Sequence, residues 1–162
     1  SYPQTLLFKS QPQLKWVKIR RRQQHGANNY IISFKDHSEL NLDFLYYPFP
    51  RQKPGTTILG IDIDSITDIV INKFDALMVR KKARDFVDLY TILSRERFSL
   101  RQLRHWHYQK FEIDIDPKEI STTFLRVNEV TTLPRMKIPF SRQRMVNFFE
   151  QLADSLKPEI FK

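Results

Sequence analysis

The segment Ser65–Leu93 reads SITDIVINKFDALMVRKKARDFVDLYTIL and sets the organisation of this chain. It opens with Ser-x-x-Asp, a version of the capping box in which the serine side chain accepts an early backbone N–H of a helix. Apolar residues then recur with the period of an α-helix. We therefore predict one helix from Ile66 to about Lys81 and a second from about Arg84 to Ser94.

Lys73 has an unusual place in the first predicted helix. At about 100° per residue, one face of this helix is apolar, and it consists of Ile66, Ile69, Val70 and Leu77. Lys73 projects into the centre of this stripe, and Arg80 lies near its edge. Burial of a lysine is unfavourable unless a carboxylate or phosphate compensates its charge. Lys73 either extends past the helix edge to water or binds an anion in a cleft, and we favour the cleft.

Two carboxylates flank the apolar stripe of the second predicted helix. That stripe consists of Phe86, Leu89, Tyr90 and Leu93. Asp85 and Asp88 are i, i+3 neighbours beside it. They can form salt bridges with Arg84 and Lys81, or they can act on one site. With a lysine in a cleft, two such carboxylates can bind a phosphate-bearing substrate and orient an attacking hydroxyl.

The residues before Ser65 predict strands, and those after the two helices predict further helices. Four runs rich in β-branched and aromatic residues are separated by turn formers: Leu14–Arg20, Asn29–Phe34, Glu39–Tyr47 and Thr56–Asp64. Three later segments have helical patterns: Ser99–Lys110, Pro117–Val127 and Ser141–Leu156. We expect an α+β protein with a mixed or antiparallel sheet in residues 1–64, packed with a helical bundle in residues 65–162.

The charge of the chain favours an acidic partner. Its formal net charge is +9, and Ser1–Lys35 holds seven basic residues without one Asp or Glu. RNA or DNA is the natural partner for such a surface, and a solvated basic surface is the alternative. The chain has no cysteine, which excludes disulfides and cysteine-ligated zinc. No apolar run reaches the roughly 18 residues of a membrane span, so we expect a cytoplasmic protein without a membrane partner.

Several other polar residues have patterns that suggest chemistry. Asp43 lies on the polar side of a predicted strand, where a lone acid is usually solvated. Asp62 and Asp64 share one side of the next strand in a geometry that can share Mg²⁺, although alternating Asp and Ile arises easily by chance. His105 and His107 fall on different helix faces, which is poor geometry for one metal. Aromatic packing explains the two histidines better.

The segment Ser65–Leu93 resembles the helical signature of AbiEii-type nucleotidyltransferases, toxin components of bacterial abortive-infection and type IV toxin–antitoxin systems. The signature has a Ser-x-x-Asp-Ile turn, Lys-x-x-Ala, an arginine one turn later, and Arg-Asp-Phe-x-Asp-Leu. The matching positions are Ser65, Asp68, Lys73, Ala76, Arg80, Arg84, Asp85 and Asp88. A looser likeness extends over Glu39–Ser94.

This resemblance implies a fold similar to DNA polymerase β-like nucleotidyltransferases. In these, a Gly-Ser or Gly-Gly helix entrance precedes Asp-x-Asp on a strand, and a third acid lies on a neighbouring strand. Asp43 matches the third acid by its order and strand pattern. None of Gly26, Gly55 and Gly60 opens such an entrance. We expect either that the chain starts after this motif or that it is a degenerate relative that binds without catalysing.

The resemblance also implies an activity and roles for the charged residues. The activity is transfer of a nucleotidyl group from an NTP to RNA, with tRNA as the acceptor in some relatives. Mg²⁺ would be held by the absent acid pair, with Asp43. Lys73, Arg80 and Arg84 would bind phosphate oxygens. Asp85 and Asp88 would orient the base, the acceptor hydroxyl or Lys73 itself, and their spacing does not separate these roles.

The basic strand region would track the RNA backbone in this interpretation. Its residues are Lys15, Lys18, Arg20, Arg21 and Arg22, with Trp16 available for stacking. A cognate antitoxin is a further implied partner. Two alternatives remain open from the residues: a nucleic-acid-binding module without chemistry, and an interaction domain whose Arg and Asp residues form salt bridges only.

Overall fold

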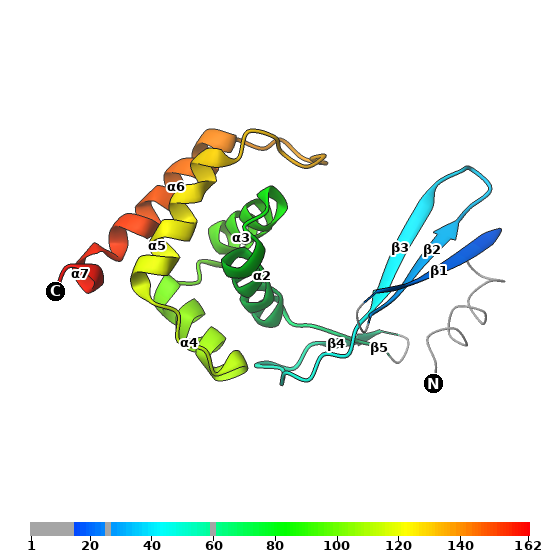
Figure 1. The fold of residues 1–162 in the computed structure, drawn as a ribbon, viewed down its shortest axis with the longest axis horizontal. Coiled ribbons are helices and arrows are strands. Elements are labelled where there is room, and N and C mark those ends of the chain that lie inside the picture. Colours follow the sequence, from blue (N-terminus) through cyan, green and yellow to red (C-terminus); the bar gives the residue numbers. More distant parts are fainter. Residues whose placement is uncertain (1–14, 25–26, 59–60) are drawn as a thin grey trace. The chain divides into compact units, whose positions relative to one another are not determined.

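The structure is a computed structural model that describes residues 15–24, 27–58 and 61–162. Contacts divide the chain into two compact units, Ser1–Pro48 and Phe49–Lys162, which we describe separately (Figure 1). Strands precede residue 64 and helices follow it, as predicted. The last two strands nevertheless belong to the same unit as the helices. A functional division of the chain at residue 64 stays a prediction.

The first unit contains a three-stranded antiparallel sheet in the order β1-β2-β3. The strands are β1 (Lys18–Gln24), β2 (Ala27–Ser33) and β3 (Glu39–Phe44). The prediction for β1 was shifted, because the predicted strand ended at Arg20 and the residues after it were counted among the turn formers. They are polar, yet they pair in register with β2 as far as Gln24 opposite Ala27. Backbone pairing overrides their polar composition here.

The second unit begins with a two-stranded hairpin formed by β4 (Thr56–Ile58) and β5 (Ile61–Ile63). We predicted one continuous strand over residues 56–64, and this was wrong because the segment folds back on itself. The antiparallel register pairs Thr56 with Ile63 and Ile58 with Ile61.

The helices follow the predicted segments closely. They are α2 (Ile66–Arg80), α3 (Ala83–Glu96), α4 (Leu100–Phe111), α5 (Pro117–Leu125), η1 (Arg126–Glu129, a 3₁₀ helix), α6 (Arg142–Ser155) and α7 (Lys157–Ile160). Side chains cap several helix starts: Ser65 Oγ accepts the N–H of Asp68, and Ser99 forms a complete capping box with Gln102. None of the helices in the described part of the chain has both the length and the apolar character needed to cross a bilayer.

The helical core forms where α2 packs against α3 and α4, and where α6 packs against α3 and α5. Its largest fully buried side chains are four phenylalanines, one each from α2, α3, α5 and α6: Phe74, Phe86, Phe124 and Phe149. The rings of Phe86 and Phe149 meet edge to face with centroids 5.2 Å apart. This aromatic core fixes the helices on which the candidate site lies.

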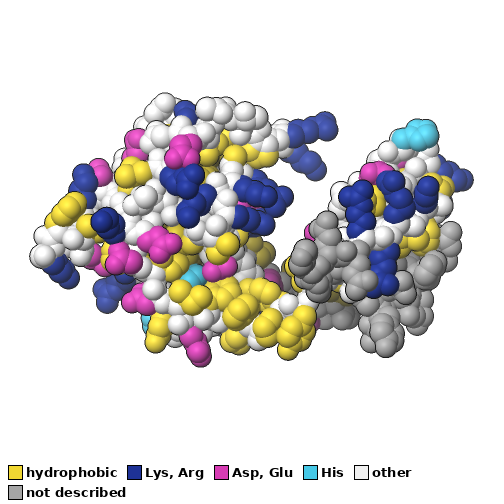
Figure 2. Space-filling view, viewed as in Figure 1, with side chains coloured by type: hydrophobic (Ala, Val, Ile, Leu, Met, Phe, Trp, Pro, Cys, Tyr) yellow, Lys and Arg dark blue, Asp and Glu magenta, His cyan; other side chains and the backbone are white. Residues whose placement is uncertain are grey.

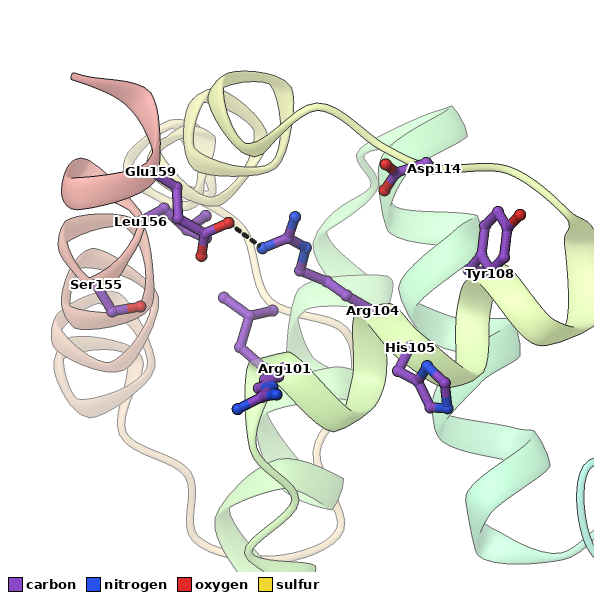
Figure 3. Close-up of a pocket in the computed structure, with 9 residues that line it drawn as sticks. Arg101, Arg104, His105, Tyr108, Asp114, Ser155, Leu156 and Glu159 are labelled. Atoms are coloured by element: carbon purple, nitrogen blue, oxygen red, sulfur yellow. Dashed lines mark hydrogen bonds and ion pairs between the residues drawn. The ribbon is translucent and has the colours of Figure 1, made fainter. Parts of the chain in front are cut away.

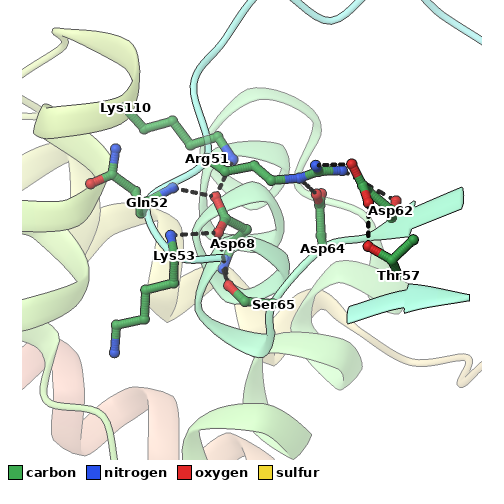
Figure 4. Close-up of polar contacts among 9 residues, drawn as sticks. All are labelled: Arg51, Gln52, Lys53, Thr57, Asp62, Asp64, Ser65, Asp68 and Lys110. Carbon is green, nitrogen blue, oxygen red and sulfur yellow. Dashed lines mark hydrogen bonds and ion pairs between the residues drawn. The ribbon is translucent and has the colours of Figure 1, made fainter. Parts of the chain in front are cut away.

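A buried carboxylate fastens the loop before β4 to the helices. The side chain of Asp68, near the start of α2, is fully buried. Lys110 of α4 donates to its Oδ1 over 2.9 Å, and the backbone N–H groups of Gln52 and Lys53 donate to its two oxygens (Figure 4). The hydroxyl of Ser65 donates to Oδ2. The Asp68 carboxylate therefore holds three separate segments together.

These hydrogen bonds decide the protonation of Asp68. Burial alone would raise the pKa of its carboxyl, because burial disfavours the charged form. The hydrogen bonds from Lys110, Gln52, Ser65 and Lys53 outweigh burial and lower the pKa from 3.8 to about 2. The folded state therefore holds Asp68 ionised, and this ionisation stabilises the fold at neutral pH.

We predict that Asp68→Asn lowers the free energy of unfolding by about 3–5 kcal/mol, because it leaves the buried Lys110 ammonium without its counter-charge. Urea unfolding followed by circular dichroism measures this change. The control is Asp114→Asn, which alters an exposed aspartate with no hydrogen bond or ion pair to described residues, and it should change stability by less than about 0.5 kcal/mol. Equal effects of the two variants would contradict the assigned role.

We predict that the stability gap between the wild type and Asp68→Asn narrows as pH falls from 5 to 2.5. The folded pKa of Asp68 lies below its ordinary value, so its contribution is complete above about pH 4 and is lost as pH falls toward 2. The lowered pKa corresponds to a linkage of about 2 kcal/mol. Urea unfolding at each pH measures the gap, and a constant gap would refute the role of ionisation.

Candidate functional site

Two ion pairs join α2 to α3. Lys73 Nζ donates to Asp88 Oδ2 over 2.6 Å. Arg80 donates through Nε and Nη2 to the two carboxylate oxygens of Asp85, over 2.9 and 2.8 Å. A two-residue turn separates the helices, which pack against each other. The structure therefore brings four of the predicted site residues together as two neighbouring pairs on one helical hairpin.

The surroundings of Lys73 differ from the prediction. The buried apolar face of α2 consists of Val70, Ile71, Phe74, Leu77 and Met78. Ile66, which the prediction placed in the apolar stripe, is 41% exposed. The stripe is thus rotated around the helix, and Lys73 lies beside it with its side chain 31% exposed. Lys73 therefore reaches its carboxylate partner without full burial of its charge.

The two aspartates of α3 differ in exposure. The side chain of Asp85 is fully buried, in the first turn of α3, whereas that of Asp88 is 42% exposed. Both oxygens of Asp85 accept hydrogen bonds from Arg80, and these bonds raise the pKa of the Arg80 guanidinium above its ordinary value. The Arg80–Asp85 pair therefore closes the hairpin firmly, and Asp88 has the accessible carboxylate.

The salt-bridge partners differ from those that we considered from sequence. Asp85 and Asp88 bind Arg80 and Lys73, and neither binds Arg84 or Lys81. Arg84 is exposed and makes no hydrogen bond or ion pair with any residue in the described ranges. It precedes Asp85 by one position, so a rotation of about 100° turns it away when Asp85 faces the core. Its guanidinium is thus available to an external anion.

Asp43 lies in the first unit, on a polar face of the sheet. It is exposed in β3, and its Oδ1 accepts a 2.5 Å hydrogen bond from Asn29 Nδ2 of β2. The pairing register places Asn29 opposite both Asp43 and Arg22. Alternation along β1 then puts Lys18 and Arg20 on this same face. We call this surface, made by Lys18, Arg20, Arg22, Asn29 and Asp43, the basic sheet face.

The remaining predicted nucleic-acid-binding residues divide between two faces of the first unit. Figure 2 shows Lys and Arg side chains gathered on the visible side of this unit. Arg20 is exposed and pairs with Glu39 over 2.7 Å. Arg21 alternates to the opposite face, and Lys15 is exposed just before β1. Trp16 is buried in a small core with Tyr30 and Ile32, so the predicted role of its ring in stacking is wrong.

The described residues do not by themselves fit a Mg²⁺ site. Nowhere in residues 15–24, 27–58 and 61–162 do three His, Cys, Asp or Glu side chains gather in a metal-binding group. Asp62 and Asp64 both bind Arg51, whose Nε lies 2.8 Å from Asp64 Oδ1 (Figure 4). The two carboxylates are therefore paired with the guanidinium of Arg51. Asp43 therefore offers one carboxylate, without companions among the described residues.

Two buried polar contacts were absent from our predictions. One is Asp68 with Lys110, and the other joins His107 of α4 to Asp75 of α2, with Nε2 and Oδ1 3.1 Å apart. Aromatic packing was expected for His107, and its ring does meet Phe74 edge to face. A signal was present, because His107 and Lys110 continue the helical stripe of two buried leucines in α4. Polar residues on such a stripe need buried partners.

The comparison with protein families covers most of the chain. The family described as "Nucleotidyl transferase AbiEii toxin, Type IV TA system" matches residues 32–160. The chain belongs to this family. The match runs from the end of β2 to the end of α7, so it includes β3, nearly all of the second unit and both ion pairs. It confirms the resemblance seen in Ser65–Leu93.

Two solved structures from Helicobacter pylori share the fold of this AbiEii chain. One is JHP933, with a TM-score of 0.51, and the other is described as a candidate nucleotidyltransferase, with a TM-score of 0.50. Each is 20% identical in sequence to this chain and aligns with 89% of it. The chain spans 65% and 67% of their respective lengths. The curated proteins contain no match. At this identity the likeness establishes the α+β fold.

We predict that Asp85→Asn and Asp88→Asn differ in their effect on stability. Asp85→Asn should lower the free energy of unfolding by about 2–3 kcal/mol, because it removes the buried negative charge and replaces one of the two acceptor oxygens of Arg80 by an amide group that cannot accept. Asp88→Asn should lower it by less than about 1 kcal/mol, because that pair is partly solvated. The two variants are matched controls for each other in urea unfolding. A larger effect at Asp88 would show that the roles are reversed.

Proposed function

We propose that the complete protein transfers a nucleotidyl group from an NTP to RNA, with tRNA as the expected acceptor. Membership of the AbiEii family supports a nucleotidyltransferase. The observation that carries the proposal is the partly exposed Lys73–Asp88 pair beside the ion pair of Arg80 with the buried carboxylate of Asp85. A cognate antitoxin is the partner that a type IV system implies, and the cytoplasm is its expected location.

Lys73 is the proposed ligand of the triphosphate. Both side chains of its ion pair with Asp88 are partly exposed, and such pairs contribute only about 0–1 kcal/mol. A triphosphate, with several negative charges, can therefore replace the single carboxylate at Nζ. Asp88, once released, is free to orient the acceptor hydroxyl and receive its proton. Without substrate, the ion pair with Asp88 holds the Lys73 side chain in the position from which it can bind a phosphate.

Arg80 and Arg84 are the proposed supporting phosphate ligands. Asp85 occupies Nε and Nη2 of Arg80, which leaves the Nη1 donors of the fork for a phosphate oxygen. Asp85 acts in this proposal as a positioning residue that fixes the guanidinium. Arg84 is exposed and makes no hydrogen bond or ion pair with the described residues. It can add a second positive charge where the negative charge of the transition state develops.

Mg²⁺ is the cofactor that the family resemblance implies. It would supply charge neutralisation at the phosphates when bound. Asp43 is our proposed contribution to its ligands from this chain. The described residues do not complete a metal site, so we assign no step of the reaction to the metal from them.

The basic sheet face is the proposed track for the RNA backbone. Lys18, Arg20 and Arg22 lie on one side of β1 by alternation, and all three are exposed. Lys15 and Arg21 would add charge from neighbouring positions. Contacts with phosphates make affinity depend steeply on salt. The same face supports a second candidate function, an RNA-binding module without chemistry, because it needs nothing from Lys73.

We predict that the full-length protein, incubated with labelled NTP, Mg²⁺ and tRNA, labels the RNA, and that Lys73→Ala reduces the rate at least about 100-fold. The loss follows from removal of the proposed triphosphate ligand. Lys118→Ala is the matched control, since it removes an exposed lysine of α5, and it should label normally. Undiminished labelling by Lys73→Ala would refute the role proposed for this lysine.

A binding measurement separates the two candidate functions. Replacing Lys18, Arg20 and Arg22 together by Ala should weaken tRNA binding and reduce the slope of log affinity against log salt by about 2. Fluorescence anisotropy across a salt series measures both quantities. Binding by the wild type without any incorporation of label would favour the binding module. An unchanged salt slope in the triple variant would refute the basic sheet face as the RNA track.

A further inference from the structure

A cavity lies on the side of α4 that faces the end of α6 and the short helix α7. It has a volume of about 600 Å³, within the range of sites that hold small molecules. It shares no lining residue with the charged pairs of α2 and α3. Its lining residues come mainly from one face of α4 and from the chain around α7: Leu100, Arg101, Arg104, His105, Tyr108, Asp114, Ser155, Leu156 and Glu159.

Two arginines give the cavity its positive side. Arg101 and Arg104 are i, i+3 neighbours on α4 that both line the cavity, and Figure 3 shows Arg104 extending to Glu159, with the guanidinium of Arg101 apart from that of Arg104. Arg104 Nη1 donates to Glu159 Oε2 over 2.8 Å. Arg101 is exposed and makes no hydrogen bond or ion pair with the described residues. One guanidinium is thus available, and the second is held by a single carboxylate.

The Arg104–Glu159 pair is exchangeable. Its side chains are 23% and 43% exposed, so the pair is partly solvated and its net contribution is small. A phosphate group offers three acceptor oxygens and more negative charge than one carboxylate, and it matches the fork of an arginine. A phosphate can therefore take the place of Glu159 on Arg104, and Arg101 adds a second positive charge to the lining of the same cavity.

The rest of the lining suits a nucleoside better than a bare anion. Tyr108 follows Arg104 by one helical turn and is 53% exposed, so its ring is open to a stacking partner. Base–aromatic stacking contributes about 1–3 kcal/mol per base. Asp114 also lines the cavity, and its carboxylate can accept hydrogen bonds from ribose hydroxyls.

We propose that this cavity binds one nucleotide unit, with its phosphate on Arg104 in a lining made more positive by Arg101, its ribose at Asp114 and its base on Tyr108. Glu159 occupies Arg104 until the phosphate displaces it. The nucleotide can be free or can belong to a single-stranded RNA. This binding is separate from the transfer reaction, because it uses none of the residues assigned to that reaction.

The test uses the full chain carrying Lys73→Ala, which removes the proposed triphosphate ligand on α2. Amide NMR titrations with inorganic phosphate and AMP measure the free ligands, and anisotropy with a labelled single-stranded RNA measures the polymer. Arg104→Ala should weaken AMP binding at least about tenfold, and Glu159→Gln should strengthen it several-fold. Tyr108→Ala should weaken AMP about tenfold and leave inorganic phosphate unchanged. The matched control is Arg95→Ala, an exposed arginine of α3 outside the cavity.

Each outcome decides the proposal. Equal AMP affinity in Arg104→Ala and Arg95→Ala would overturn it, as would weaker binding in Glu159→Gln. Arg104→Lys keeps the charge and removes the fork, so a loss in a variant with wild-type thermal stability still reports on phosphate binding. If AMP binds and the RNA does not, the ligand is a free nucleotide. If the RNA binds more tightly and depends on the same residues, the site belongs to an RNA strand.

The result is distinguishable from failure of the proposed transfer reaction. Wild-type protein that binds AMP at the cavity but labels no RNA would sustain this inference and refute the transferase proposal. If the wild type labels RNA and the Lys73→Ala variant binds no nucleotide at the cavity, the transferase proposal is sustained and this inference is refuted. Shifted amide signals of α4, rather than those of α2 and α3, identify the cavity as the site in the NMR titrations.

Discussion

The buried carboxylate of Asp68 is the constraint on which the helical unit depends. It lies near the start of α2 and binds Lys110 of α4 and the backbone of Gln52 and Lys53. If this carboxylate were neutral or absent, a buried ammonium and two backbone N–H groups would lose their partners together. The hydrogen bonds therefore fix α2 against α4, and α2 in turn presents Lys73 and Arg80 to the carboxylates of α3. An interaction remote from the candidate site thus sets its geometry.

The sequence predicted the helices well because their signals are local. Ser65 and Ser99 mark helix starts through capping, and apolar residues recur with helical period after each. The strand predictions failed where pairing decided the structure. The polar residues at the end of β1 form a strand because β2 lies opposite, and residues 56–63 form a hairpin although they resemble one strand. Backbone pairing between distant residues is not visible in a local pattern.

The candidate site was only partly predictable for a related reason. Lys73, Arg80, Asp85 and Asp88 were identified from sequence, but their pairing and burial were not. By spacing alone, Asp85 and Asp88 are equally suited to act at the site. A small rotation of α3 decides which of them is buried and which is exposed. Lys73 was placed in the apolar stripe because Ile66 was counted as core, whereas it is exposed. The phase of a helix relative to its neighbours determines which polar side chains remain accessible.

Exposure of the carboxylate divides the ion pairs of the helical unit into two kinds. Asp68 and Asp85 are fully buried, so their partners cannot leave without stranding a charge in the protein interior. Asp88 and Glu159 are about two-fifths exposed, so water can solvate them when their partners turn to another anion. The buried pairs therefore maintain the fold, whereas Lys73 and Arg104 hold positions from which a phosphate can displace a carboxylate at little cost. In a chain of net charge +9, this difference in burial, rather than the number of basic residues, identifies the places where phosphate groups are expected to bind.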